Sequence, residues 1–179
     1  KGKFITPGLI DAHSHSGVMD DVNECTDAIT AEVRISDILD PTSISLYREL
    51  AGGLTAANVL HGSCNPIGGQ NAVIKLRYGV STPEQLLFAE APQGIKFALG
   101  ENVKQSNWGN EATNRYPKSR MGVIQLIRDR FLAAKEYRES WRRYAEAQRQ
   151  GDRTALPPRR DLELDALVEV LEGKRLLHC

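Results

Sequence analysis

Two histidines separated by one residue are the strongest chemical feature of this sequence. His13 and His15 directly follow the apolar run 9–12, which is typical of a buried strand. Because side chains alternate faces along a strand, both rings lie on one face, with Cα atoms about 6.6 Å apart. Two converging imidazoles supply half of a zinc, iron or manganese site. Asp11 lies on the same face and can support a ligand histidine.

One lysine and one glutamate near the apolar run 94–100 are further candidates. Lys96 lies inside that run. Burying a bare ammonium is costly, so Lys96 needs a partner or a chemical modification, unless it reaches the surface. Glu101 follows the run, where its carboxylate can bind a metal or remain an ordinary loop acid.

The remaining candidates are two isolated histidines and several loop side chains. His178 ends the apolar run 175–179, and His61 follows the run 54–60. His61 can line a pocket mouth, but a hydrogen-bonded structural role is the alternative for each histidine. Polar side chains in the loops are candidates for contacts to a polar or anionic substrate: Gln70, Asn71, Asn102, Lys104, Trp108, Arg115 and Arg120.

Apolar runs and helix-start signals divide the chain into short alternating elements. We predict strands at 9–12, 54–60, 72–76, 94–100 and 175–179. We predict helices at 42–50, from Thr82 to before Pro92, from about 119 to 150 and at 162–172, with residues 17–41 and 62–69 mainly in loops. Short apolar strands alternating with helices predict a parallel α/β architecture.

The amino-acid composition limits the classes of protein to which this chain can belong. The 179 residues carry 23 basic and 23 acidic side chains, and this balance argues against a nucleic-acid or anionic-membrane partner. The three cysteines, Cys25, Cys64 and Cys179, are widely spaced and predict neither a disulfide framework nor a cysteine-rich zinc module. The chain starts and stops within apolar elements, so we expect it to be part of a longer protein whose compartment the sequence leaves open.

The segment around the histidine pair resembles a known family. The run Pro7-Gly8-Leu9-Ile10-Asp11-Ala12-His13-Ser14-His15 resembles the first barrel strand of the amidohydrolase superfamily of metal-dependent hydrolases. Residues 52–55 resemble its second-strand entry, and residues 68–76 resemble the imidazolonepropionase-like branch. The resemblance implies that residues 1–179 are an incomplete (β/α)₈ barrel of the TIM type, about the first five strands with their helices, with the site at the strand C-termini.

The resemblance also implies a ligand set. His13 and His15 would bind one divalent metal, most often zinc, with iron or manganese as alternatives, and His178 would bind a second. The bridging carboxylate would be a carbamylated Lys96 or Glu101, and Gln70, Asn102 and His61 are the candidate substrate contacts. A histidine from a sixth strand and a general-base aspartate from an eighth would lie beyond Cys179.

The expected activity is hydrolysis of a C–N bond in an amide, cyclic amide or peptide by a metal-activated water. The substrate would be a small molecule or short peptide, and the chain would need the remainder of its own barrel. Two alternatives stay open, an inactive scaffold or binding domain and a heterocycle deaminase. A homo-oligomer is compatible with the sequence, which does not define the oligomeric state.

Overall fold

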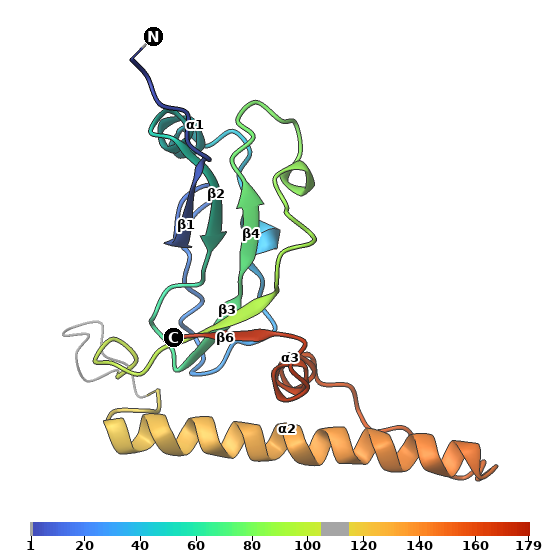
Figure 1. Ribbon diagram of the computed structural model, residues 1–179. Coiled ribbons are helices and arrows are strands. Elements are labelled where there is room, and N and C mark those ends of the chain that lie inside the picture. The colour runs from blue at the N-terminus through green and yellow to red at the C-terminus, as the bar shows by residue number, and fades with distance from the viewer. Residues whose placement is uncertain (1, 105–114) are drawn as a thin grey trace.

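The computed structural model describes residues 2–104 and 115–179, and within them two three-stranded sheets meet at an angle (Figure 1). The first sheet has the order β1-β2-β4 and the second the order β3-β5-β6. Their strands are β1 (Leu9–Ser14), β2 (Leu54–Val59), β3 (Ile67–Gln70), β4 (Ala72–Lys75), β5 (Gly94–Phe97) and β6 (Leu176–His178). The first sheet stands upright in Figure 1, and the second lies across its lower end.

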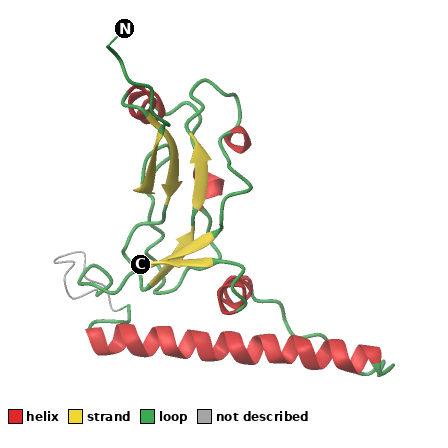
Figure 2. Cartoon of the chain, viewed as in Figure 1, coloured by secondary structure: helices red, strands yellow, loops and turns green. Residues whose placement is uncertain are grey.

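The helices lie mainly at the two ends of this arrangement (Figure 2). They are α1 (Ile44–Ala51), α2 (Arg120–Arg149) and α3 (Leu162–Leu171), with 3-10 turns η1 (Ile35–Ile38) and η2 (Pro83–Gln85). The Ser119 hydroxyl accepts a hydrogen bond from the backbone N–H of Gly122 and caps α2; the Asp161 carboxylate caps α3 through Leu164. In the described part of the chain, no helix is both long and apolar enough to span a membrane.

Two apolar clusters hold the sheets in place. One packs α2 and α3 against the second sheet around Ile67, Ile95 and Leu167. The other packs α1 against the first sheet around Leu46 and Val59. The distal half of α2 extends beyond the sheets, as its Arg- and Glu-rich sequence predicts (Figure 1).

Most sequence-based elements are confirmed, and two are corrected. The five predicted strands and the helices near 42–50, 119–150 and 162–172 are present within a few residues. The structure adds β3 where a loop was predicted. The helix predicted from Thr82 is limited to η2, because the backbone of Leu86 and Phe88 pairs with β4 instead of continuing the helix.

The strand directions also differ from the all-parallel arrangement predicted above. β1 pairs with β2 and β5 with β6 in parallel, but β4 is antiparallel to β2 and β3 is antiparallel to β5. A parallel return requires a crossover of a dozen or more residues, usually a helix. No helix occurs among residues 60–93 apart from η2, so the chain returns antiparallel. The fold is therefore mixed α/β.

Candidate metal site

The two histidines of the opening motif converge at the end of β1. Their Nε2 atoms lie 3.3 Å apart, and the rings are nearly perpendicular. The Nδ1–H of His15 donates to the Leu60 carbonyl oxygen at 2.8 Å. In the neutral ring this bond places the proton on Nδ1 and leaves a lone pair on Nε2, the atom that faces His13.

A β-bulge next to His13 interrupts the regular pairing of β1 with β2. Asp11 pairs with Ala57 and Ser14 with Val59, so two residues of β1 face the single residue Asn58 of β2. Bulges bend a strand and redirect side chains, and they occur often beside functional sites. The Asp11 carboxylate accepts the backbone N–H of His13 at 3.0 Å, so it supports this backbone.

Lys96 and His178 are register partners on the parallel strands β5 and β6. Lys96 is buried, and within the described ranges no carboxylate is within ion-pair distance of its ammonium. The Nε2 atom of His178 is also buried, and it has no hydrogen-bond partner among the described residues. Buried polar groups without partners are uncommon in folded proteins, so the Nε2 atom of His178 is a group that a ligand would satisfy, and Lys96 is its neighbour on the adjacent strand.

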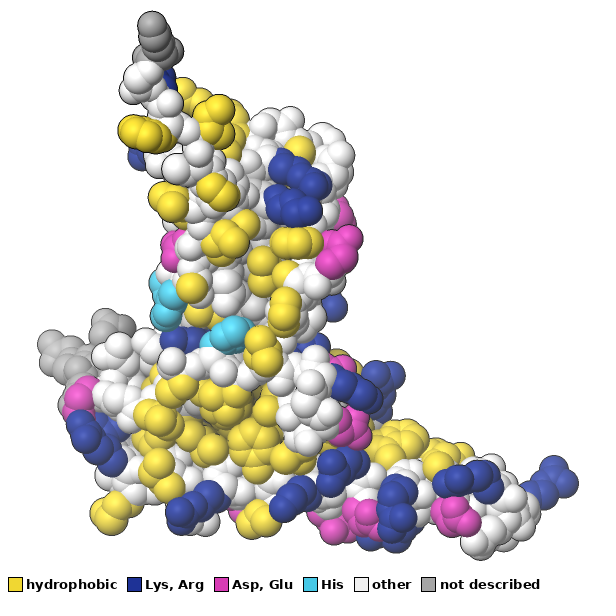
Figure 3. Space-filling view, in the orientation of Figure 1, with side chains coloured by type: hydrophobic (Ala, Val, Ile, Leu, Met, Phe, Trp, Pro, Cys, Tyr) yellow, Lys and Arg dark blue, Asp and Glu magenta, His cyan; other side chains and the backbone are white. Residues whose placement is uncertain are grey.

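Electrostatics couple the four candidates across the two sheets. Burial lowers the pKa of His13 most, nearby Lys96, His15 and His178 lower it further, and Asp11 partly opposes them. Burial and then Lys96 lower the pKa of His178. Both shifts favour the neutral imidazole, the form that binds metal ions. Histidine side chains gather beside a basic side chain where the two sheets meet (Figure 3).

The donor set fits part of a metal site. Two nitrogens bound to one tetrahedral zinc ion at 2.0–2.1 Å lie about 3.3 Å apart, which equals the His13–His15 separation. Three converging His, Cys, Asp or Glu side chains are not found within residues 2–104 and 115–179. The pair would therefore supply two ligands of such a site, and Lys96 and His178 lie on the neighbouring sheet.

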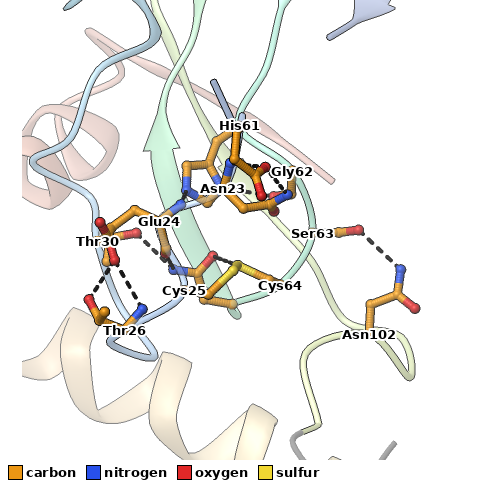
Figure 4. Close-up of a disulfide and its surroundings, with 12 residues drawn as sticks. Asn23, Glu24, Cys25, Thr26, Thr30, His61, Gly62, Ser63, Cys64 and Asn102 are labelled. Atoms are coloured by element: carbon orange, nitrogen blue, oxygen red, sulfur yellow. Dashed lines mark hydrogen bonds between the residues drawn. A yellow bond between two sulfur atoms is a disulfide. The ribbon is translucent and has the colours of Figure 1, made fainter. Parts of the chain in front are cut away.

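Glu101 and Asn102 take part in other contacts. The Glu101 carboxylate forms ion pairs with the mostly buried Lys104 at 2.6 Å and with the exposed Arg120 at 2.9 Å. The Asn102 amide donates to the Ser63 hydroxyl at 3.2 Å (Figure 4). Trp108 lies outside the described residues.

His61 and Gln70 hold loops of the chain together. His61 is buried; its Nε2 accepts the Glu24 N–H at 2.8 Å, and its Nδ1–H donates to the Gly62 carbonyl at 2.9 Å (Figure 4). Of the two roles that the sequence left open for His61, the geometry supports the structural one. The Gln70 amide donates to the Ala31 carbonyl at 2.9 Å.

The prediction that the cysteines lack a disulfide is wrong. Cys25 and Cys64 form one, with Cα atoms 5.8 Å apart (Figure 4), whereas Cys179 is a free, exposed thiol. The separation of 39 residues hides the pair in the sequence, but the loops that leave the neighbouring strands β1 and β2 meet in space. The Arg115 guanidinium donates to the carbonyls of Cys25, Asp27 and Cys64, so it supports this loop junction.

Comparisons with known proteins identify the relatives of the chain. No protein-family model matches it. It is 32% identical over 193 aligned positions to the amidohydrolase tasK of Hapsidospora irregularis, an alignment that covers 97% of this chain and 19% of tasK. A crystal structure of an amidohydrolase from Thermotoga maritima MSB8 matches with a TM-score of 0.77 at 33% identity, covering 93% of this chain and 43% of that one.

These two similarities confirm the resemblance that the histidine motif indicates: the chain is related to the amidohydrolase superfamily. It spans about a fifth of one relative and less than half of the other.

Proposed function

We propose that the protein containing this chain is a metal-dependent hydrolase of C–N bonds, and that residues 1–179 are an incomplete (β/α)₈ barrel domain supplying part of its site. The observation that carries the proposal is the convergence of His13 and His15 at 3.3 Å between their Nε2 atoms. The relationship to amidohydrolases supports a hydrolase, and the sequence motif supports the imidazolonepropionase-like branch.

The chain would hold a divalent ion, zinc first, through His13 and His15, with Lys96 and His178 serving a second ion. Such ions supply Lewis-acid activation of water and polarisation of a carbonyl. Between the two bridge candidates we favour Lys96, because it is buried beside His178, whereas Glu101 already forms ion pairs with Lys104 and Arg120. Carbamylation would convert the Lys96 ammonium into an anionic ligand.

The substrate in this proposal is an amide, cyclic amide or short peptide. The remainder of the barrel would supply a further histidine, a general-base aspartate and cover for exposed apolar residues of β1 and β6, which include Leu9, Ile10, Leu176 and Leu177. A scaffold that has lost activity is the alternative if those groups are absent from the parent protein. A heterocycle deaminase would use the same residues, and substrate screening separates it.

The direct test is the metal content of the intact protein after a His13→Ala/His15→Ala double substitution. We expect bound zinc to fall by at least one ion per chain, together with loss of hydrolysis of a panel of amides and cyclic amides. His61→Gln is the matched control, because it removes a buried histidine whose ring forms hydrogen bonds only with the backbone of Glu24 and Gly62 among the described residues. Unchanged zinc in the double variant would contradict the assignment. A mass increase of one carbon dioxide on the Lys96 peptide tests the bridge.

A further inference from the structure

Asn71 occupies the joint between the two sheets. It separates β3 from β4: Gln70 pairs with Ile95 of β5, and Ala72 pairs with Val59 of β2. The candidate ligands are divided by the same joint, since His13 lies in β1 of the β1-β2-β4 sheet and His15 directly follows this strand. Lys96 and His178 belong to the β3-β5-β6 sheet. The relative placement of the two sheets therefore sets the relative placement of the candidate ligands.

The buried side chain of Asn71 joins both sheets through a directional hydrogen-bond relay. The side-chain Oδ1 of Asn71 accepts a hydrogen bond from the backbone N–H of Gly94. The backbone N–H of Asn71 donates to the Gly94 carbonyl at 3.1 Å. Its Nδ2 donates to Oδ1 of Asn58, and Nδ2 of Asn58 donates to the Ala12 carbonyl at 3.3 Å. A backbone donor at one end and a backbone acceptor at the other fix the orientation of both amides.

Each end of this relay lies beside a candidate ligand. Ala12 precedes His13 in the β-bulge, where a regular ladder is interrupted, and the Asn58 side chain supplies a donor to the Ala12 carbonyl. Gly94 is two residues before Lys96 on the same face of β5. The relay thus connects the backbone that aims His13 with the backbone that carries Lys96.

We propose that Asn58 and Asn71 are positioning residues of the metal site: they hold the His13–His15 strand in register with the Lys96–His178 strands. This inference rests on the proposed function. Loss of either amide leaves the ligand residues unchanged but loosens the joint between their sheets. Outer groups that orient metal ligands affect metal affinity by about 10–100-fold.

The experiment compares four variants of the intact protein: Asn58→Ala, Asn71→Ala, the Asn58→Ala/Asn71→Ala double variant and the control Asn65→Ala. Asn65 is as buried as Asn71, but its amide donates to the Glu24 and Asp27 carbonyls and to the Thr30 hydroxyl, which fixes a loop. Zinc affinity is measured by competition with a chromophoric chelator, at a temperature below the melting transition of every variant. Melting curves record the stability of each protein separately.

We expect Asn58→Ala and Asn71→Ala to weaken zinc binding about 10–100-fold, and the double variant to lose little more than either alone. The Asn65→Ala control should stay within about threefold of the unsubstituted protein even where its melting temperature falls. Because Asn58 is only partly buried, its variant keeps the test decisive if Asn71→Ala does not fold.

Two results would contradict the relay but leave the proposed function standing. One is an equal loss of zinc affinity in the three single variants, which indicates a general effect of stability. The other is an unchanged zinc affinity in both Asn58→Ala and Asn71→Ala. In those cases the His13→Ala/His15→Ala variant still loses zinc. Failure of the unsubstituted protein to bind zinc would overturn both the relay and the proposed function.

Discussion

The imidazole of His178 lies against the α-carbon of Gly94 on the neighbouring strand. A Cβ placed at residue 94 would be 2.2 Å from Nε2 of His178 and 3.1 Å from the carbonyl oxygen of Leu176. No side chain larger than hydrogen fits at residue 94 while the ring keeps this position. The absence of a Cβ at Gly94 therefore makes room for the His178 ring, whose buried Nε2 atom has no hydrogen-bond partner among the described residues.

Gly94→Ala should accordingly displace the His178 ring and distort the pairing of β5 with β6. We expect a loss of about 1–3 kcal/mol in the free energy of unfolding, the usual range for overpacking. If His178 binds a metal ion, zinc stoichiometry should fall as well. Gly100→Ala is the control, because a Cβ there meets no atom of residues 2–104 and 115–179 within 4 Å. Equal stability and zinc content in the two variants would refute this role for Gly94.

Buried His61 should make the loop junction sensitive to acid. Burial is the main reason that the pKa of His61 is lowered; the Gly62 carbonyl, Glu24 and Asp21 oppose this, and His15 adds to it. A histidine whose pKa is depressed by folding takes up its proton more readily in the unfolded chain. Its contribution to stability is therefore fully present above about pH 6.5, the ordinary histidine pKa, and is lost as the pH falls below that value through the lowered folded-state pKa.

His61→Gln should flatten this dependence, because glutamine can donate and accept without titrating. The measurement is urea unfolding of both proteins at about pH 7.5, 6.5 and 5.5, which lie above, at and below the ordinary histidine pKa. His13 and His178 are present in both proteins, so the difference between the curves isolates His61. Parallel curves would exclude a titrating role for it.

The disulfide should contribute strongly to stability. It closes a loop between residues 39 positions apart, and loops of this size correspond to about 2–4 kcal/mol. Paired Cys25→Ser and Cys64→Ser substitutions should lower the unfolding free energy by that amount, and a dithiol reductant should do the same to the unsubstituted protein. Cys179→Ser should have no effect. Three alkylated thiols in denatured, unreduced protein would show that the bond is absent.

The sequence predicted the convergence of the two histidines better than it predicted which strands are neighbours. His13 and His15 could be placed together because strand periodicity is local, and their convergence is observed. The Cys25–Cys64 bond and the Asn71 joint depend on which strands are neighbours, and no short-range pattern reports that. The helix predicted from Thr82 forms only one turn, because the backbone of Leu86 and Phe88 then forms hydrogen bonds with β4.

Glu163 on α3 offers a test in which removing a charge should stabilise the chain. Its side chain is 16% exposed and lies 2.6 Å from Arg130. Burial raises its pKa to about 6, Arg130 opposes that rise, and Glu32 and Asp161 add to it. A carboxyl group with a raised folded-state pKa favours folding most below about pH 4.5, and this contribution is lost as the pH rises through about 6.

Glu163→Gln should therefore raise the unfolding free energy at pH 7.5 by up to about 2 kcal/mol, the equivalent of the rise from 4.5 to about 6. The gain should vanish near pH 4, where the carboxyl group is protonated in both states. Glu172→Gln is the control: a hydrogen bond from Lys174 lowers the pKa of Glu172, so neutralising it should give no gain. Destabilisation by Glu163→Gln at pH 7.5 would show instead that the ion pair with Arg130 outweighs the burial of the Glu163 charge, since Arg130 would then be left without its partner.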